Sequence, residues 1–309
     1  MKKRVLVVGA AGFLASKFIS KYKDKYRIIS SIKSKKKKNF KLFKGTKIII
    51  ENILNKKKDY KPQKIDVVIY SVALDAAQSA DNNLKSKKVN YEAVKVFCKY
   101  LKSNEVKKVI KLSTIKVYGK NPNFSLSEKS KFNPEDNYSK HILKSDMYLE
   151  KFCNKNKINF QILRVSNGFG VPAIKTKESS RVLVNSFVYQ ASLLKKIYIS
   201  SQFNMVKNFI RIENIVDCID FLIKKQNVPN GVYLLAGKSN YDLASIVRLI
   251  KKTFKKEFNK EIIIDYNFNK KKLNKNFKIE NNKIKKIGFN FIKKDKQEII
   301  KLIKYYSKI

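Results

Sequence analysis

Short apolar runs rich in β-branched residues recur through the first 165 residues, and longer amphipathic stretches separate most of them. The runs lie at 4–9, 26–32, 46–51, 65–71, 107–113 and 159–165, and the helical stretches at 12–23, 84–103 and 137–155. Continuous apolar strands joined by helices are typical of parallel sheets that are buried on both faces. Because such crossovers build a doubly wound sheet, the sequence predicts an α/β fold.

The spacing becomes irregular after residue 165, which predicts a smaller C-terminal α/β lobe that binds the substrate. The expected elements are a loop at 166–180, helices near 178–194, 213–225 and 242–255, strands at 207–212 and 231–237, and a mixed tail. We therefore predict a dinucleotide-binding domain at 1–165, with 207–230 packing back on it. The substrate lobe then comprises 166–206 and 231–309.

The formal net charge of +46 raises the alternative of a nucleic-acid binder. Arginine, the usual residue for forked phosphate and base contacts, is scarce among these cations. It occurs at Arg4, Arg27, Arg164, Arg181, Arg211 and Arg248. Lysine is spread over the whole chain, with a local run at 33–38. This pattern indicates a solvated basic surface, and nucleic-acid binding is disfavoured.

The three cysteines, Cys98, Cys153 and Cys218, are scattered and lack metal-ligand spacing. They predict reduced thiols in a cytoplasmic protein, with no metal site and no disulfide framework. The basic and then apolar start is short and broken by glycines, so we interpret it as a strand and turn. No stretch approaches the roughly 20 apolar residues of a membrane span.

The segment "VVGAAGFLAS" places glycines between the first strand and the first helix. Gly9 permits a tight turn, Gly12 lets a pyrophosphate approach the backbone, and Ala15 lets the helix pack on the strand. The N–H groups at the start of the helix, around Phe13 and Leu14, then face the phosphates. The alternative is a plain strand–turn–helix connection.

The end of the second strand lacks the acidic residue that usually binds the adenosine ribose of NAD. Ile32 takes its position, and Lys33, Ser34 and Lys35 follow. These cations favour the 2′-phosphate of NADP, although they can also be ordinary surface lysines. The cofactor prediction is therefore NADP or NAD, with a preference for NADP.

Eight segments in order resemble the extended short-chain dehydrogenase/reductase family, the NAD(P)-dependent nucleotide-sugar epimerases and dehydratases. They are "GAAGFLA", "VIYSVAL" at 68–74, "VNYEAV" at 89–94, "LSTIKVYG" at 112–119, Tyr138, "LRVSNGFG" at 163–170, "KNFIRIENIVDCI" at 207–219 and "GVYLLAGKS" at 231–239. The resemblance implies a Rossmann sheet, a nucleotide-sugar substrate and hydride transfer. It also implies a homodimer formed through the helices at 84–103 and 137–155.

The same resemblance assigns roles to individual residues. Thr114 would hydrogen-bond the reacting sugar oxygen beside the catalytic Tyr138, and Asn167 and Lys207 would bind the substrate diphosphate. The remaining cofactor contacts are assigned to Asn52 and Ile53 near the adenine, to Ser71, Val72 and Ala73 along the cofactor, and to Asn90 and Ser113 near the nicotinamide.

Tyr138 lacks the lysine that this family carries four residues on, because Ile142 stands there. That lysine lowers the tyrosine pKa and holds the nicotinamide ribose. His141, the chain's single histidine, is the candidate substitute. Three alternatives stay open: an enzyme in which His141 or the cofactor assists Tyr138, an enzyme with a different base, and a binding protein that has lost catalysis.

We expect a nucleotide-sugar epimerase or 4-keto reductase. Dehydratases of the family carry an acidic pair after the catalytic threonine, whereas Ile115 and Lys116 follow Thr114 here. Dehydration is therefore disfavoured.

Overall fold

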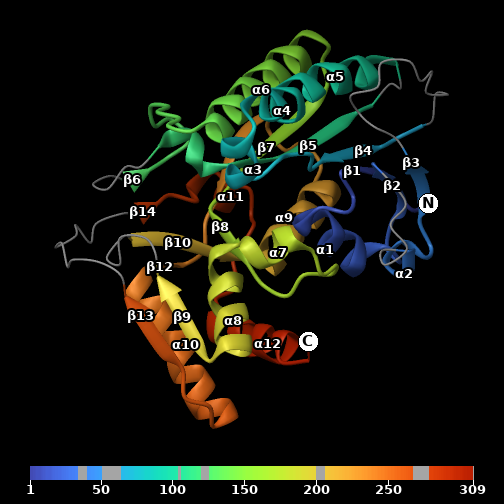
Figure 1. Ribbon diagram of the computed structural model, residues 1–309. Helices are drawn as coiled ribbons and strands as arrows, with labels where there is room; N and C mark the ends of the chain where they lie inside the picture. Colours follow the sequence, from blue (N-terminus) through green and yellow to red (C-terminus); the bar gives the residue numbers. More distant parts are fainter. Residues whose placement is uncertain are drawn as a thin grey trace. The chain divides into compact units, whose positions relative to one another are not determined.

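The computed structural model describes residues 1–33, 40–50, 64–103, 106–119, 125–199, 206–266 and 278–308. The chain forms two compact units, each described separately below (Figure 1). Unit 1 comprises Met1–Lys120, Glu128–Arg164 and Val216–Tyr233, and unit 2 comprises Asn121–Ser127, Val165–Ile215 and Leu234–Ile309. Compactness does not test independent folding, so the domain boundaries predicted from the sequence remain a proposal.

Unit 1 is built on a seven-stranded sheet with the strand order β11-β7-β5-β4-β1-β2-β3. Its strands are β1 (Arg4–Val8), β2 (Arg27–Ile32), β3 (Lys47–Ile50), β4 (Val67–Tyr70), β5 (Lys108–Thr114), β7 (Asn159–Val165) and β11 (Gly231–Leu235). The pairs β1–β2, β1–β4, β2–β3 and β4–β5 are parallel. The order reverses at β1, which confirms the predicted doubly wound α/β fold.

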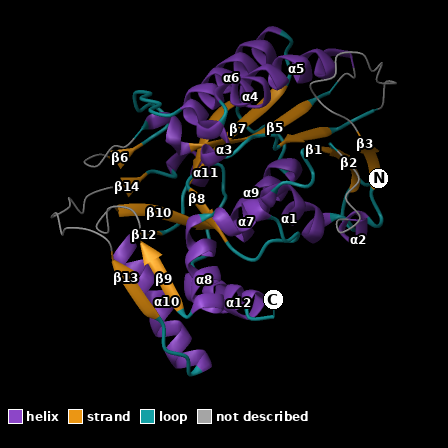
Figure 2. Cartoon of the chain, viewed as in Figure 1, coloured by secondary structure: helices purple, strands orange, loops and turns teal. Residues whose placement is uncertain are grey.

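Helices cover both faces of this sheet, with α4, α5 and α6 on one side and α1 and α9 on the other (Figures 1 and 2). The helices are α1 (Phe13–Tyr22), α2 (Phe40–Phe43), α3 (Ala76–Asp81), α4 (Asn83–Lys87), α5 (Ala93–Ser103), α6 (Asn137–Lys155) and most of α9 (Ile212–Lys224). The single helix predicted at 84–103 is interrupted by a π-helix at Lys88–Glu92. Periodicity alone could not show this extra residue per turn.

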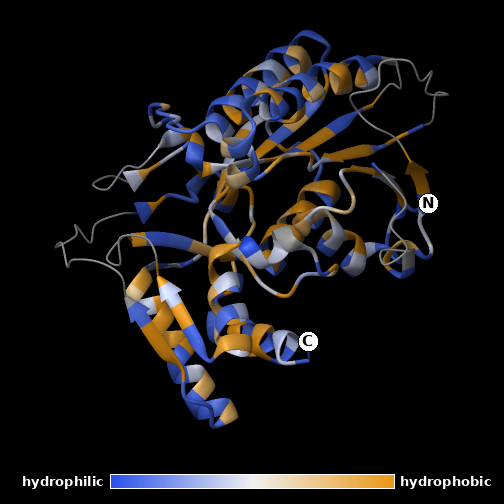
Figure 3. Ribbon diagram, viewed as in Figure 1, coloured by the Kyte–Doolittle hydropathy of each residue, from blue (hydrophilic) through white to orange (hydrophobic). Residues whose placement is uncertain are grey.

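Buried aliphatic and aromatic side chains join the sheet to α5 and α6, and in Figure 3 the strands are coloured mainly as hydrophobic. The cluster includes Leu6, Val8, Val68, Tyr70, Val94, Phe97, Leu101, Val109, Leu149, Phe160 and Ile162. The rings of Tyr70 and Phe97 lie 4.6 Å apart between their centroids. The strands are apolar on both faces because helices exclude water from both.

Two lysines close the C-terminal end of α9, where the last carbonyl groups have no partner within the helix. Lys108 Nζ donates to the carbonyl oxygen of Leu222 at 2.5 Å, and Lys3 Nζ donates to that of Ile223 at 2.6 Å. Burial and the neighbouring charge of Lys3 lower the pKa of Lys108 to about 8.

This lowered pKa makes the stability of the protein depend on pH in a defined direction. Between pH 8 and about 10.4, the ordinary pKa of lysine, the unfolded chain holds a proton at Lys108 that the folded chain has released. The contribution of Lys108 to the free energy of unfolding therefore rises with pH in this window. We expect urea unfolding to show a smaller rise from pH 7.5 to 10 for Lys108→Met than for the wild type. The exposed neighbour variant Lys107→Met should follow the wild type, and equal slopes in all three would contradict the prediction.

Unit 2 contains three small sheets, with strand orders β12-β10-β8, β13-β9 and β14-β6. Its strands are β6 (Ser125–Leu126), β8 (Asn167–Phe169), β9 (Lys196–Ile199), β10 (Val206–Arg211), β12 (Ser239–Asp242), β13 (Ile263–Tyr266) and β14 (Lys278–Ile279). Its helices are α7 (Lys177–Arg181), α8 (Leu183–Leu194), α10 (Leu243–Phe258), α11 (Asn282–Lys286) and α12 (Asp295–Tyr306). The helix predicted at 178–194 breaks at Val182, and the predicted loop at 166–180 contains β8.

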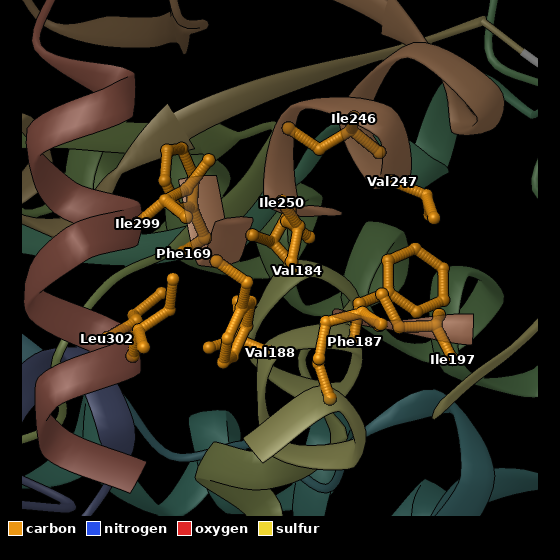
Figure 4. Packing of buried hydrophobic residues seen from close by; sticks show 14 of the residues in the cluster. Phe169, Val184, Phe187, Val188, Ile197, Ile246, Val247, Ile250, Ile299 and Leu302 are labelled. Carbon is orange, nitrogen blue, oxygen red and sulfur yellow. The ribbon is translucent and has the colours of Figure 1, made fainter. Parts of the chain in front are cut away.

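A second hydrophobic core holds unit 2 together, with α8, α10 and α12 contributing side chains around β8 and β9 (Figure 4). Val184 and Val188 of α8 belong to the same cluster of buried side chains as Ile250 of α10 and Leu302 of α12. Since α12 lies in the tail whose structure the sequence left undefined, this core depends on contacts between distant segments. Within the residues that the structure describes, no helix is both long and apolar enough to span a membrane.

Candidate active site

The turn between β1 and α1 packs its glycines closely against neighbouring backbone and leaves the N-cap of α1 without a side chain. Gly9 has φ +79°, and a Cβ there would lie 3.0 Å from both the Ser71 carbonyl oxygen and Val72 Cγ2. Gly12 is the N-cap of α1, so no side chain covers the first N–H groups of that helix. A helix N-terminus with an uncovered glycine cap suits a pyrophosphate, and this turn therefore fits a dinucleotide. Phe13 and Leu14, also predicted to contact the cofactor, form the first turn of α1.

The segment after β4 is held by Asn90, a buried residue of the π-helix. The Asn90 amide oxygen accepts a hydrogen bond from Leu74 N at 2.7 Å, and its Nδ2 donates to Ser79 Oγ at 3.1 Å. Nδ2 also lies 3.3 Å from Ser86 Oγ. Because Leu74 directly follows the predicted cofactor contacts 71–73, Asn90 fixes the backbone that carries them.

Only some of the residues predicted to contact the adenosine end of the cofactor lie within the described part of the chain. Lys33 is exposed immediately after β2, and Ala10 N donates to the carbonyl oxygen of Ser31 in the same strand at 3.0 Å. Asn52 and Ile53 lie outside the described residues. The preference for NADP therefore stays a prediction.

Tyr138 and Thr114 come together from different elements. Thr114 is the last residue of β5, and Tyr138 lies in the first turn of α6. That turn begins at Asp136, whose carboxylate accepts from Ser139 N at 2.7 Å while Ser139 Oγ accepts from Asp136 N. This capping box sets the start of the helix. The Thr114 side chain hydrogen-bonds Tyr138.

The surroundings of Tyr138 keep its phenol protonated at neutral pH. Burial raises the pKa of Tyr138 to about 12, and the negative charges of Asp136, Asp146 and Asp75 act in the same direction. The hydrogen bond from Thr114 opposes this rise without cancelling it. A phenol with this pKa carries its proton at neutral pH and is therefore in the form that can donate it, although the high pKa makes it a weak acid.

His141 faces a network inside unit 1. Its Nδ1 lies 2.9 Å from Ser86 Oγ, which also lies close to Asn90. Burial lowers the pKa of His141, and the charges of Lys144, Lys87 and Lys140 lower it further. A neutral, buried imidazole does not supply the positive charge that the missing lysine would provide, so the contacts of His141 favour a positioning role. Its predicted catalytic role remains untested.

A buried charge cluster, which sequence reasoning missed, joins β5, α6 and β7 near the end of β5. Asp146 of α6 binds Lys111 Nζ through Oδ1 at 2.6 Å and Arg164 Nε through Oδ2 at 3.3 Å. Ser113 Oγ donates to the same carboxylate at 2.7 Å, and Arg164 Nη1 donates to the Tyr118 hydroxyl at 2.6 Å. The sequence signal that could have revealed this cluster is Asp146 itself, an acidic residue one turn after Ile142 on the buried face of a lysine-rich helix.

Lys116 is a second residue that the sequence did not assign to the site. It lies in the 3-10 helix Ile115–Tyr118, directly after β5, and its backbone N–H donates to Thr114 Oγ1 at 3.2 Å. Its Nζ lies 5.6 Å from the centroid of the Tyr138 ring. This distance is within the range of a cation–π contact.

The two predicted substrate residues belong to the small sheet of unit 2. Asn167 of β8 donates through Nδ2 to the carbonyl oxygen of Asn208 at 2.9 Å, and Lys207 precedes Asn208 in β10. Asn208 accepts from Ser166 Oγ at 2.7 Å and from Gly237 N at 2.8 Å, which ties the central strand β10 to the segments just before β8 and β12. The assignment of Asn167 and Lys207 to substrate binding remains a prediction.

The fold and the site define a dinucleotide-binding α/β protein with a tyrosine–threonine pair at the carboxyl end of β5. The model of the NAD dependent epimerase/dehydratase family matches residues 5–236. The match covers most of the 309 residues, and the chain therefore belongs to this family. This confirms the predicted family, its nicotinamide dinucleotide cofactor and the predicted class of enzyme.

Individual relatives are distant. A curated dTDP-D-glucose 4,6-dehydratase of Dictyostelium discoideum is 26% identical over 78% of this chain, and the alignment covers 61% of that relative. An ADP-L-glycero-D-manno-heptose-6-epimerase of Brachyspira hyodysenteriae is 24% identical, with 81% of each chain covered. The solved UDP-N-acetylglucosamine 4-epimerase of Methanobrevibacter ruminantium M1 is 23% identical, with full coverage of both chains and a TM-score of 0.84. This chain thus spans less than two thirds of the Dictyostelium protein.

Proposed function

We propose that this protein reduces a keto group of a nucleotide-activated sugar, with Tyr138 as the proton donor. The observation that carries the proposal is the placement of Tyr138, in the first turn of α6, beside Thr114 at the end of β5. Burial raises the pKa of Tyr138 to about 12, which is compatible with a protonated phenol at neutral pH. When bound, a nicotinamide dinucleotide supplies the hydride that adds to the carbonyl carbon of the sugar.

The proton balance of this reaction falls on the tyrosine. As the carbonyl carbon gains a hydride, the carbonyl oxygen gains a proton from the Tyr138 hydroxyl, and a secondary alcohol forms. Thr114 supports this step by donating a hydrogen bond to the phenol oxygen, which bears negative charge once the proton has left. The reverse step, oxidation, needs Tyr138 as a base, and little of the phenolate that it requires is present at neutral pH because the pKa of Tyr138 is raised.

The names of the relatives support a nucleotide-sugar substrate, because these names refer to dTDP-, ADP- and UDP-linked sugars. We propose that Asn167 and Lys207 bind the diphosphate, with Lys207 acting as a point charge. Dehydration remains disfavoured, because a lysine at position 116 cannot take the part of an acidic residue in removing water.

Deuterium transfer tests the proposed function directly. Purified protein is incubated with NADPH or NADH carrying deuterium at C4 of the nicotinamide and with a panel of dTDP-, UDP- and ADP-linked keto sugars. We expect mass spectrometry to find one deuterium in the sugar alcohol and an equal amount of oxidised cofactor. Conversion between sugar epimers without cofactor consumption would instead identify an epimerase. Tight cofactor binding with no transfer to any sugar would identify a binding protein.

A homodimer formed through residues 84–103, which comprise most of α4, the π-helix and α5, and through α6 at 137–155 is retained as a proposal, as is a cytoplasmic location. Within unit 1, α5 and α6 pack against each other (Figure 1). Cys98, Cys153 and Cys218 are all free and buried, which is compatible with a reducing compartment.

A further inference from the structure

The helix that carries Tyr138, the proposed proton donor, has an apolar residue one turn after the tyrosine, where the family carries a lysine. Ile142, one turn after Tyr138, is 2% exposed and carries no charge. Each turnover in the proposed reaction leaves a phenolate at Tyr138, and the carboxylates of Asp136, Asp146 and Asp75 make that anion less stable. A nearby cation would offset this cost.

Two residues near Tyr138, His141 and Lys116, are candidates for such a charge. His141 is unsuitable, because it bonds Ser86 and because burial and neighbouring lysines keep it neutral. Lys116 lies in the 3-10 helix that follows β5, and its ammonium nitrogen lies 5.6 Å from the centroid of the Tyr138 ring.

We propose that Lys116 is the cation that stabilises the phenolate of Tyr138, in place of a lysine on α6. This inference rests on the proposed function and adds a positioning residue to it. The attachment of Lys116 supports the role, since its backbone N–H binds the hydroxyl of Thr114, which itself hydrogen-bonds Tyr138. One short segment therefore presents both a hydrogen-bond donor and a positive charge to the tyrosine.

The expected size of the effect follows from the distance and the exposure. The ammonium lies inside the Debye length of about 8 Å at physiological ionic strength, so salt only partly screens it. Lys116 is exposed, which gives the charge a surface-like effective dielectric constant rather than that of a protein interior. We expect its removal to raise the tyrosine pKa by about 0.5 to 1 pH unit, equivalent to about threefold to tenfold in the ionisation constant.

A direct titration of residue 138 tests this without turnover. We would replace Tyr138 site-specifically with 3,5-difluorotyrosine, whose ring fluorines lower the phenol pKa so that its titration can be followed below the range of the native tyrosine. Fluorine NMR between pH 6 and 10 then reports the midpoint. Lys116→Met should raise the midpoint by about 0.5 to 1 pH unit, and Lys116→Arg should restore it. The matched control Lys140→Met removes an exposed lysine two residues from Tyr138 on α6 and should leave the midpoint unchanged.

Two outcomes would overturn the inference: an unchanged midpoint in Lys116→Met, or an equal shift in Lys140→Met, which would indicate net charge alone. Circular dichroism and thermal unfolding of each variant establish that it is folded. In the protein with native Tyr138, sugar reduction should fall about threefold to tenfold in Lys116→Met and recover in Lys116→Arg. If the NMR midpoint shifts although no sugar is reduced by the wild type, the proposed function fails while the role of Lys116 stands.

Discussion

Replacing Asp146 with Asn is expected to lower the free energy of unfolding by about 3–5 kcal/mol. Asp146 is 1% exposed and lies between two cations that are equally enclosed, Lys111 at 1% and Arg164 at 2%. Asparagine keeps the shape of the side chain but leaves both cations buried without a counter-charge. Removing one partner of a buried ion pair costs far more than the pair contributes, since the remaining charge has lost its water.

Urea unfolding at pH 7 measures this cost, and a surface pair provides the control. Asp265 binds Lys196 Nζ at 2.7 Å, with the two side chains 42% and 32% exposed. Asp265→Asn should cost less than about 1 kcal/mol. The double variant Asp146→Asn, Lys111→Met should lose less stability than Asp146→Asn alone, because one unpaired cation is gone. A cost for Asp146→Asn as small as that of the surface control would show that the cluster does not carry two buried positive charges.

Tyr138→Phe is expected to slow sugar reduction by about 10²- to 10⁴-fold, the usual contribution of a positioned proton donor. Phenylalanine fills the same space on α6, so cofactor affinity should stay within a small factor of the wild type. The wild-type rate should be independent of pH between 6 and 9, because the tyrosine loses its proton only as the pH approaches a pKa of about 12.

Stopped-flow measurement of cofactor oxidation at saturating sugar gives both quantities. Tyr148→Phe is the matched control, since Tyr148 lies on the same helix and contacts Tyr91 edge-on at 6.5 Å between ring centroids. It should retain the wild-type rate. A rate in Tyr138→Phe within tenfold of the wild type would assign proton donation to another group, and a midpoint near pH 7 would do the same.

The fold of unit 1 could be predicted because its signals are local. The runs that became β1 and β4 are apolar on both faces, and the glycines of the first turn occur where the strand ends. Such features follow from the burial of each segment and need no knowledge of its neighbours. Unit 2 was predicted less completely: β8, β9 and α12 were missed because short strands and a lysine-rich tail carry a weak pattern.

The candidate site shows the same division at the level of residues. The sequence and its family resemblance were enough to single out Tyr138 and Thr114, and the structure brings them into hydrogen-bonding contact. His141 was selected by its spacing on the helix, which ignores Ser86 on another element. The sequence drew attention to Lys116 only because dehydratases carry an acidic residue at this position. Nothing in the position of Lys116 along the chain shows that it lies over the Tyr138 ring.

The sequence by itself therefore determined most of the strands and helices of unit 1, the glycine turn predicted to bind phosphate and the tyrosine that the proposed chemistry requires. These depend on residue type and spacing within one segment. Only the tertiary structure decided which charges surround that tyrosine, because Asp146 of α6 pairs with Lys111 of β5, and Lys116 of the 3-10 helix after β5 lies over the Tyr138 ring. The effect of a charge is set by its distance and burial, and neither quantity exists until the chain has folded.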